Sequence, residues 1–341
     1  MPPAARRRRP VTVLGLLLLL ACAPACSPGP VPAPAPRPGP SGGVAEADGS
    51  PFWVDPQGVA ARQVAAWEAQ GRYHDAQVLR RISERPTALW VRGGDPGPEI
   101  RRARAGAKAA GRTVLLTAHR LPYRGCAPHP SGGARDAAAY RAWTAAFAAA
   151  VADAPALVVL EPDALAHTLD GCTPADRQDE RYRLLSEAVD RLKRNPHTRV
   201  YLDAGDPARI PDPARLVDPL RRAGLAHADG FALNVSGHQD DAAARAYGAR
   251  LSKAVGGKHF VLDTGPGGAG PAPGGGQDPA PCNPPGRSLG TPPTDRTGDP
   301  LVDAYLWIRT PGTSDGPCRG GPAAGEWWPE HALGLARRAL D

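Results

Sequence analysis

The sequence of 341 residues lacks the marks of several common classes of protein. Its six cysteines include no CxxC pair, so a zinc site made of paired thiolates is not expected. No stripe of Lys and Arg interleaved with aromatic residues is present, which argues against nucleic-acid binding. No glycine-rich dinucleotide fingerprint follows the first predicted strand, which argues against an open nucleotide-binding sheet. After residue 21 no apolar run is long enough for a membrane-spanning helix, which needs about 20 residues.

The beginning of the chain has the order of a secretory signal. Four arginines, Arg6–Arg9, precede the apolar run Val11–Ala21, and small residues follow. Leu19–Cys22 resembles a bacterial lipobox, in which the cysteine is lipidated and becomes the new N-terminus. The alternative is ordinary cleavage near Ala25, without a lipid. Without the four arginines the formal net charge of +7 falls to +3, so the basic balance is weak evidence for a nucleic-acid partner.

Three segments of different composition follow from these features. We assign residues 1–26 to a signal peptide with a lipobox candidate at Cys22. Residues 27–50 are rich in Pro, Gly and Ala and predict an extended tether that cannot build a core. Residues 51–341 predict one folded domain, a length that is normal for an α/β barrel.

Short apolar runs alternate with helical patterns through residues 51–341, which is typical of a parallel sheet covered on both faces. The predicted strands are Ala88–Val91, Thr113–Thr117, Ala156–Leu160, Arg199–Leu202, Gly230–Asn234, Phe260–Leu262 and Ala304–Ile308. The predicted helices are Ile100–Ala110, Asp136–Ala152, Asp176–Arg194, Pro213–Ala223 and Asp240–Val255.

An open doubly wound sheet and a closed barrel both fit this alternation, and the polar residues favour the barrel. Strand after strand is followed by a polar or charged residue: His119, Asp163, Asp203, Asn234, Asp263 and, a little later, Asp315. In a barrel these carboxyl ends converge on one mouth, where barrel active sites lie. We therefore predict an α/β fold, a distorted parallel (β/α) barrel with about seven strands.

Several aspartates at one mouth, without the spacing of a metal site, point to hydrolysis of a glycosidic bond. That reaction needs one carboxylic acid that keeps its proton for the leaving oxygen and a carboxylate on the far side of the sugar. Crowding of aspartates raises the pKa of one of them, because like charges disfavour a second ionisation. Any one of these aspartates alone is more often a helix cap or a turn residue. The prediction therefore depends on the whole set.

Several motifs, in order, resemble glycoside hydrolase family 6, the secreted cellobiohydrolases and endoglucanases that cleave β-1,4-glucan with inversion. They are VVLEPDAL (158–165), YLDAG (201–205), NVS (234–236), CNPPGRSLGTPPT (282–294) and TGDPLVDAYLWIRTPGTSDG (297–316). The resemblance implies that Asp163 is the general acid, that Asp203 helps to keep it protonated, and that Asp315 is the candidate base. It also implies that a sugar ring stacks on Trp90. The residues implied to contact the sugar are Trp90, Asn234, Arg309, Thr313 and His119.

The cysteines after the signal region sit at positions 126, 172, 282 and 318. In an exported protein four widely spaced cysteines indicate two disulfides, and the sequence alone allows three connectivities. The resemblance implies the pairs Cys126–Cys172 and Cys282–Cys318. No metal and no organic cofactor is implied.

The sequence also departs from the pattern of that family. His119 stands where the family has tyrosine, Gly125 where it has aspartate, and Asp206 where it has histidine. Arg309 replaces a lysine and Thr313 a glutamate, which changes the geometry of the hydrogen-bond donors and acceptors. His119 could therefore act as a substitute base or sugar contact, or simply as a hydrogen-bonding loop residue.

These observations lead to a single leading hypothesis. We expect an exported glucanase that cleaves β-1,4-glucan, such as cellulose or cello-oligosaccharides, by single displacement, with activity weakened by the departures. The alternative is a catalytically reduced, surface-tethered protein that binds polysaccharide. We expect a monomer that is extracellular or lipid-anchored on the outer face of the cell membrane. The true polysaccharide, and whether cleavage is internal or from chain ends, stay open.

Overall fold

The computed structural model describes residues 49–125, 133–269 and 282–339. The segments assigned to a signal peptide and a tether lie almost entirely outside these residues, as do Cys22 and Cys126, so those assignments stay predictions. Among the described residues, no helix has the length and apolar character that crossing a membrane requires.

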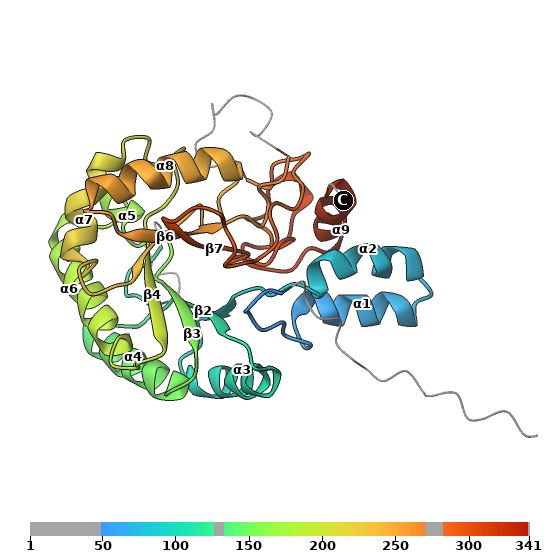
Figure 1. Cartoon of the computed structure of the whole chain (residues 1–341), viewed down its shortest axis with the longest axis horizontal. Helices are drawn as coiled ribbons and strands as arrows, with labels where there is room; N and C mark the ends of the chain where they lie inside the picture. Colours follow the sequence, from blue (N-terminus) through green and yellow to red (C-terminus); the bar gives the residue numbers. More distant parts are fainter. Residues whose placement is uncertain (1–48, 126–132, 270–281, 340–341) are drawn as a thin grey trace, which may run out of the picture. The chain divides into compact units, whose positions relative to one another are not determined.

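One parallel sheet of seven strands forms the centre of the domain, with the strands side by side in sequence order (Figure 1). The strands are β1 (Leu89–Val91), β2 (Val114–Ala118), β3 (Ala156–Leu160), β4 (Thr198–Asp203), β5 (Gly230–Leu233), β6 (His259–Asp263) and β7 (Val302–Leu306). Each predicted strand corresponds to one of these, with boundaries shifted by at most two residues.

The sheet curls so that the segments beside its first and last strands meet. The backbone N–H of Ala88 donates to the carbonyl of Trp307 (3.1 Å), and Trp90 Nε1 donates to the carbonyl of Ile308 (2.7 Å). The prediction of a distorted parallel barrel with about seven strands is therefore confirmed.

The strands β2 and β3 are buried on both faces, which explains why they are almost continuous apolar runs. In β3 all five residues are buried. Leu157 and Val159 pack inside the curl with Tyr201 and Ile308, whereas Val158 and Leu160 pack outside against the helices. Successive side chains thus alternate between two cores, as the period of a strand requires.

Helices cover the outer face of the sheet (Figure 1). They are α3 (Gly97–Ala110), α4 (Ala137–Val151), α6 (Ala175–Leu192), α7 (Val217–Arg222) and α8 (Asp241–Ala254). Asp136 and Asp240 cap α4 and α8 by accepting the backbone N–H of Ala139 (2.7 Å) and Ala243 (2.9 Å). Such a cap is worth about 1 kcal/mol and fixes where the helix begins.

The single helix predicted over 213–223 is two elements, the 3₁₀ turn η1 (Pro213–Leu216) and then α7. A continuous α-helix would need the N–H of residue 219 to donate to Arg215, and Pro219 has no N–H.

Three helices that the sequence did not predict pack together beside the sheet. They are α1 (Val59–Ala69), α2 (Tyr73–Ser83) and α9 (Pro329–Arg338), and their buried side chains form a separate apolar cluster that includes Trp67, Leu79 and Ile82. The short elements α5 (Ala166–Leu169) and η2 (Cys318–Gly320) complete the described structure.

Candidate active site

A cleft of about 1010 Å³ opens at the carboxyl ends of the strands. Six of the predicted site residues line it: Trp90, His119, Asp163, Arg309, Thr313 and Asp315. Asp203 and Asn234 do not line it and are 3% and 0% exposed. The sheet therefore brings a side chain of β1 and side chains that follow β2, β3 and β7 to one place, as the barrel hypothesis requires.

The turn Glu161–Asp163, which ends β3, gives its two acids different surroundings. Glu161 and Asp163 have φ values of 51° and 68°, a left-handed conformation that is uncommon outside glycine. Glu161 is buried, and its carboxylate accepts the backbone N–H groups of Arg120 and Leu121 (both 2.9 Å). Burial raises the pKa of Glu161 to about 7 against these hydrogen bonds. Glu161 thus holds the loop after β2, while Asp163 is left at the cleft.

Asp163 is held from two sides. Its backbone N–H donates to Asp203 Oδ2 (2.7 Å), which ties the turn after β3 to the end of β4. Its carboxylate accepts a hydrogen bond from Arg209 Nη1 (2.6 Å), and the same guanidinium binds Asp170 (2.6 Å). The guanidinium of Arg209 thus links two acidic side chains that follow β3.

Asp203 is the carboxyl group that holds a proton at neutral pH. Burial and the charge of Asp163 raise the pKa of Asp203 to about 8, against the hydrogen bonds that its oxygens accept from the backbone of Asp163 and Gly205. Nearby, burial also raises the pKa of Asp206, whose Oδ1 accepts the backbone N–H groups of Ala208 (2.9 Å) and Arg209. Asp206 therefore shapes the turn that carries Arg209.

Asp315 also lines the cleft, and its carboxylate lies in a network of hydrogen-bond donors. His238 Nε2 lies 3.1 Å from Asp315 Oδ2, the backbone N–H of Asn283 donates to the same oxygen (2.6 Å), and Arg309 Nη1 binds the other oxygen. Burial raises the pKa of Asp315, but His238, Arg309 and the Asn283 amide outweigh it and hold this pKa well below its usual range. Asp315 is therefore a carboxylate at all ordinary pH values.

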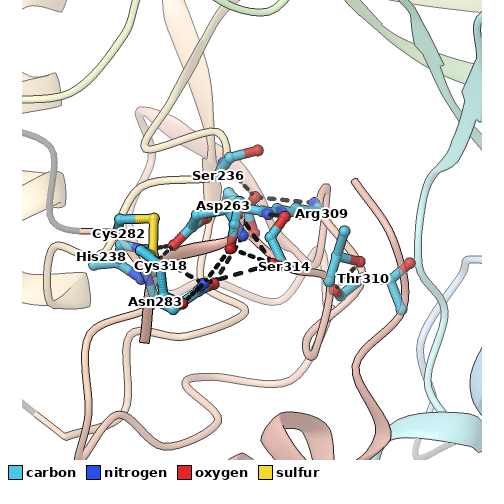
Figure 2. A network of polar contacts seen from close by, with 12 residues as sticks. Ser236, His238, Asp263, Cys282, Asn283, Arg309, Thr310, Ser314 and Cys318 are labelled. Atoms are coloured by element: carbon cyan, nitrogen blue, oxygen red, sulfur yellow. Dashed lines mark hydrogen bonds and ion pairs between the residues drawn. A yellow bond between two sulfur atoms is a disulfide. The ribbon is translucent and has the colours of Figure 1, made fainter. Parts of the chain in front are cut away.

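Asp263 organises the backbone behind this network. Figure 2 shows Asp263 between Ser236 and Arg309, with Asn283 and the Cys282–Cys318 disulfide nearby. Its carboxylate accepts the backbone N–H groups of Ser236 (3.1 Å) and Arg309 (3.0 Å), and also those of Gly265 and Ile308. Burial nevertheless raises the pKa of Asp263 to about 6. One buried side chain thus positions the segments after β5 and β7.

The predicted Cys282–Cys318 disulfide is present, with 6.3 Å between the two Cα atoms. It holds the segment before Asn283 against the segment that follows Asp315. Because Cys126 lies outside the described residues, the Cys126–Cys172 pair stays a prediction.

Trp90 and His119 meet edge to face at the cleft, with ring centroids 5.2 Å apart. Arg124 Nη1 lies 3.1 Å from His119 Nδ1 and donates to the His119 carbonyl (2.7 Å). Burial and the charges of Arg124, Arg92 and His167 lower the pKa of His119 to about 3. A neutral imidazole that accepts from Arg124 at Nδ1 carries its proton on Nε2, so its free ring nitrogen is a donor and not a base.

The two remaining predicted contacts have structural partners of their own. The side chain of Asn234 donates to the carbonyls of Asp263 (2.9 Å) and Gln239 (3.2 Å), and it is fully buried. Thr313 lines the cleft, and its hydroxyl donates to the carbonyl of Thr310 (2.8 Å). Direct sugar contact by Asn234 stays a prediction. In this conformation Asn234 has no exposed surface that a sugar could touch.

Arg209, His238 and Asn283 were not predicted from the sequence. They lie between 32 and 77 positions from the aspartates they contact, so no local pattern joins them. For Arg209 and His238 the available signal was their position in the sequence, since they follow the carboxyl ends of β4 and β5. Within the described ranges, no group of three or more His, Cys, Asp or Glu residues could hold a metal ion.

Comparison with known proteins gives one consistent result. Residues 47–339 match the family model described as glycosyl hydrolases family 6. The chain is 38% identical over 294 residues to endoglucanase A of Cellulomonas fimi, covering 85% of this chain and 62% of that protein. It is 39% identical over 293 residues to endoglucanase 1 of Streptomyces halstedii, covering 82% and 87%. The chain thus spans less than two thirds of the first relative.

Among solved structures, the domain is similar to the endoglucanase Cel6 from Mycobacterium tuberculosis. That structure is a complex with methyl-cellobiosyl-4-deoxy-4-thio-β-D-cellobioside. The TM-score is 0.77 at 38% sequence identity, and the match covers 85% of this chain and 98% of that one.

Proposed function

The chain belongs to glycosyl hydrolases family 6, and from this premise we propose that it is an exported glucanase that cleaves β-1,4-glucan by single displacement with inversion. The observation that carries the proposal is that Asp163 and Asp315, which follow different strands, line the same cleft. Two carboxyl groups on opposite sides of a glycosidic bond are the minimum that such hydrolysis needs.

Asp163 is the proposed general acid. Its proton passes to the glycosidic oxygen as the bond from the anomeric carbon to that oxygen breaks, and a water attacks the same carbon from the opposite face. For this step Arg209 has to release the carboxylate, which its bond to Asp170 permits without leaving the guanidinium unpaired. Asp203 supports the acid by holding the backbone of residue 163 and by carrying a proton itself at neutral pH.

Asp315 is the proposed base. Its carboxylate form at neutral pH supports the role, since a base must be ionised. The same low basicity makes direct proton removal inefficient, so we infer that Asp315 acts through a chain of water molecules and that its fixed negative charge stabilises the developing positive charge on the sugar. His119, as a neutral donor, is proposed to contact a sugar hydroxyl and not to remove a proton.

Export is supported by the Cys282–Cys318 disulfide, because disulfides persist in oxidising compartments. We propose that the chain acts as a monomer, either secreted or held on the outer face of the membrane by a lipid on Cys22. Mass spectrometry of the mature N-terminus separates these two forms.

The direct test is hydrolysis of carboxymethylcellulose and cello-oligosaccharides by the protein and by Asp163→Asn. We expect the variant to lose at least about 100-fold in kcat, the usual cost of removing a general acid. Asp179→Asn is the matched control, because Asp179 is 82% exposed and pairs with Arg222 on the outer helices. Binding of these ligands by the wild-type protein without turnover would contradict the proposal.

A further inference from the structure

The cleft contains more arginine than its neutral proposed substrate explains. Arg92, Arg124, Arg209 and Arg309 all line it. Arg209 binds Asp163, Arg309 binds Asp315, and Arg124 is hydrogen-bonded to His119. Among the described residues, none forms an ion pair with the guanidinium of Arg92 or accepts a hydrogen bond from it. No negatively charged group of these residues therefore contacts this cation.

Arg92 is held in place by contacts other than ion pairs among the described residues. It follows β1, and its carbonyl accepts a hydrogen bond from Arg120 Nη1 (2.9 Å). Its guanidinium lies 5.0 Å from the centre of the Trp90 ring. It also lies against the backbone at Gly325, where a Cβ atom would come within 2.8 Å of Arg92 Nη1 and where φ is +85°. The Trp90 ring and the Gly325 backbone thus aim the guanidinium.

The surroundings of Arg92 are positive. Burial and the charges of Arg124 and Arg309 lower the pKa of Arg92, and Glu99 opposes them only in part. The charges of Arg92 and Arg124 also contribute to keeping His119 neutral. Removing a guanidinium from water without a counter-charge costs free energy. A bound anion would recover that cost.

We propose that the Trp90 end of the cleft, where Arg92 and the Nε2–H of His119 are the donors, binds a carboxylate carried by the sugar chain, and that the substrate is a β-1,4-linked glycan containing uronic acid units. The planar fork of arginine matches a carboxylate with two parallel hydrogen bonds. Trp90, exposed to the same cleft, offers an apolar ring beside this charge, which suits a sugar ring that carries a carboxylate in place of its hydroxymethyl group. The inference deepens the proposed function and depends on it for the β-1,4 linkage.

The test compares two tetrasaccharides, cellotetraose and the β-1,4-linked tetramer of glucuronic acid. Their dissociation constants are measured by calorimetry with full-length Asp163→Asn protein, so that turnover does not interfere. We expect the acidic tetramer to bind about tenfold more tightly at low salt, because hydrogen bonds to charged groups are among the strongest in water. The preference should shrink at high salt, since screening weakens charge interactions.

Adding Arg92→Gln should reduce the preference to about twofold or less, and adding Arg221→Gln should leave it as it was. Arg221 is 73% exposed on α7 and pairs with Asp218, so this control removes the same charge away from the cleft. Thermal melting of both variants verifies that they are folded. Equal affinity for the two tetramers, or a preference that survives Arg92→Gln in a folded protein, would overturn the inference.

The outcome is separable from that of the proposed function. If the wild-type protein hydrolyses cellotetraose but binding shows no preference for the acidic tetramer, the anion site is contradicted and the glucanase proposal is not. An acidic preference that depends on Arg92, without turnover of either tetramer, would support the anion site and contradict the enzyme proposal.

Discussion

At the scale of single residues, the carboxyl groups near the cleft differ in what neutralises them. Asp315 is matched by a guanidinium, an imidazole and a backbone amide, and it stays ionised. Asp203 is buried beside another carboxylate, which raises its pKa to about 8, so that it keeps its proton at neutral pH. Asp163 forms an ion pair with Arg209, which also binds Asp170.

Asp203 should make the folded protein less stable as pH rises. Its pKa is raised from 3.8 to about 8 on folding, so the folded state binds the proton more tightly than the unfolded state. The stabilisation from this proton is present in full below the unfolded pKa of 3.8 and is lost as pH rises from there to about 8, by up to about 1.4 kcal/mol per pH unit. Glu161 and Asp263, with raised pKa values of their own, act in the same direction.

In Asp203→Asn the fall in the free energy of unfolding between pH 5 and 8 should therefore be shallower than in the wild type, since asparagine does not titrate. Urea unfolding at several pH values measures this slope. Asp179→Asn should keep the wild-type slope. Parallel slopes for Asp203→Asn and the wild type would mean that Asp203 is not protonated in the folded protein.

At the scale of elements, buried side chains at the ends of the strands hold the loops that form the site. Glu161 ties the loop after β2 to the end of β3, and Asp203 ties the turn after β3 to β4. Asp263 does the same for the segments after β5 and β7. The cleft is thus assembled from pairs of neighbouring strands by acids that do not enter it.

Removing Asp263 should be costly because four backbone N–H groups lose their acceptor. We expect Asp263→Ala to lower the free energy of unfolding by about 3 kcal/mol or more, since each buried group left unpaired costs roughly 1–3 kcal/mol. Asp263→Asn keeps one acceptor oxygen and the side-chain volume, so its loss should be smaller. Equal stability of the two variants in urea would contradict this role.

The elements were easier to predict than the site. β3 has the predicted bounds, Ala156–Leu160, because a strand buried on both faces is a continuous apolar run. The helices α1 and α2 were missed although Val64 and Trp67, like Leu79 and Ile82, are three positions apart on one face. In α1 five of the eleven residues are alanine, so the larger apolar side chains do not stand out as a face in the sequence.

The aspartates could be predicted because each follows a strand, and all strand ends meet at one mouth. Their partners could not, because the Arg209–Asp163 and His238–Asp315 contacts join residues 46 and 77 positions apart. Such pairs are fixed only when the sheet curls. Which of two adjacent acids faces the cleft, Glu161 or Asp163, depends on the left-handed backbone of the turn.

At the scale of the whole domain, the sheet edges meet through the Ala88–Trp307 and Trp90–Ile308 hydrogen bonds, so the cleft lies at the mouth of a curled sheet. The Cys282–Cys318 disulfide adds a covalent link at the same end. It joins cysteines 36 positions apart and brings Asn283 to Asp315.

The variant with both Cys282 and Cys318 changed to serine should lose about 4 kcal/mol of stability in the chain-entropy model. It should also lose activity, since Asn283 is no longer held against Asp315. Urea unfolding and kcat on cellotetraose measure the two effects. A variant with wild-type stability would show that the folded loop needs no covalent constraint.

The most direct test of the central claim, single displacement between Asp163 and Asp315, is the anomeric form of the first product. Proton NMR of cellotetraose during the first minutes of reaction, before the anomers equilibrate, records it. The account predicts that the newly formed reducing end appears as the α-anomer. A newly formed β-anomer would mean double displacement and would contradict the account.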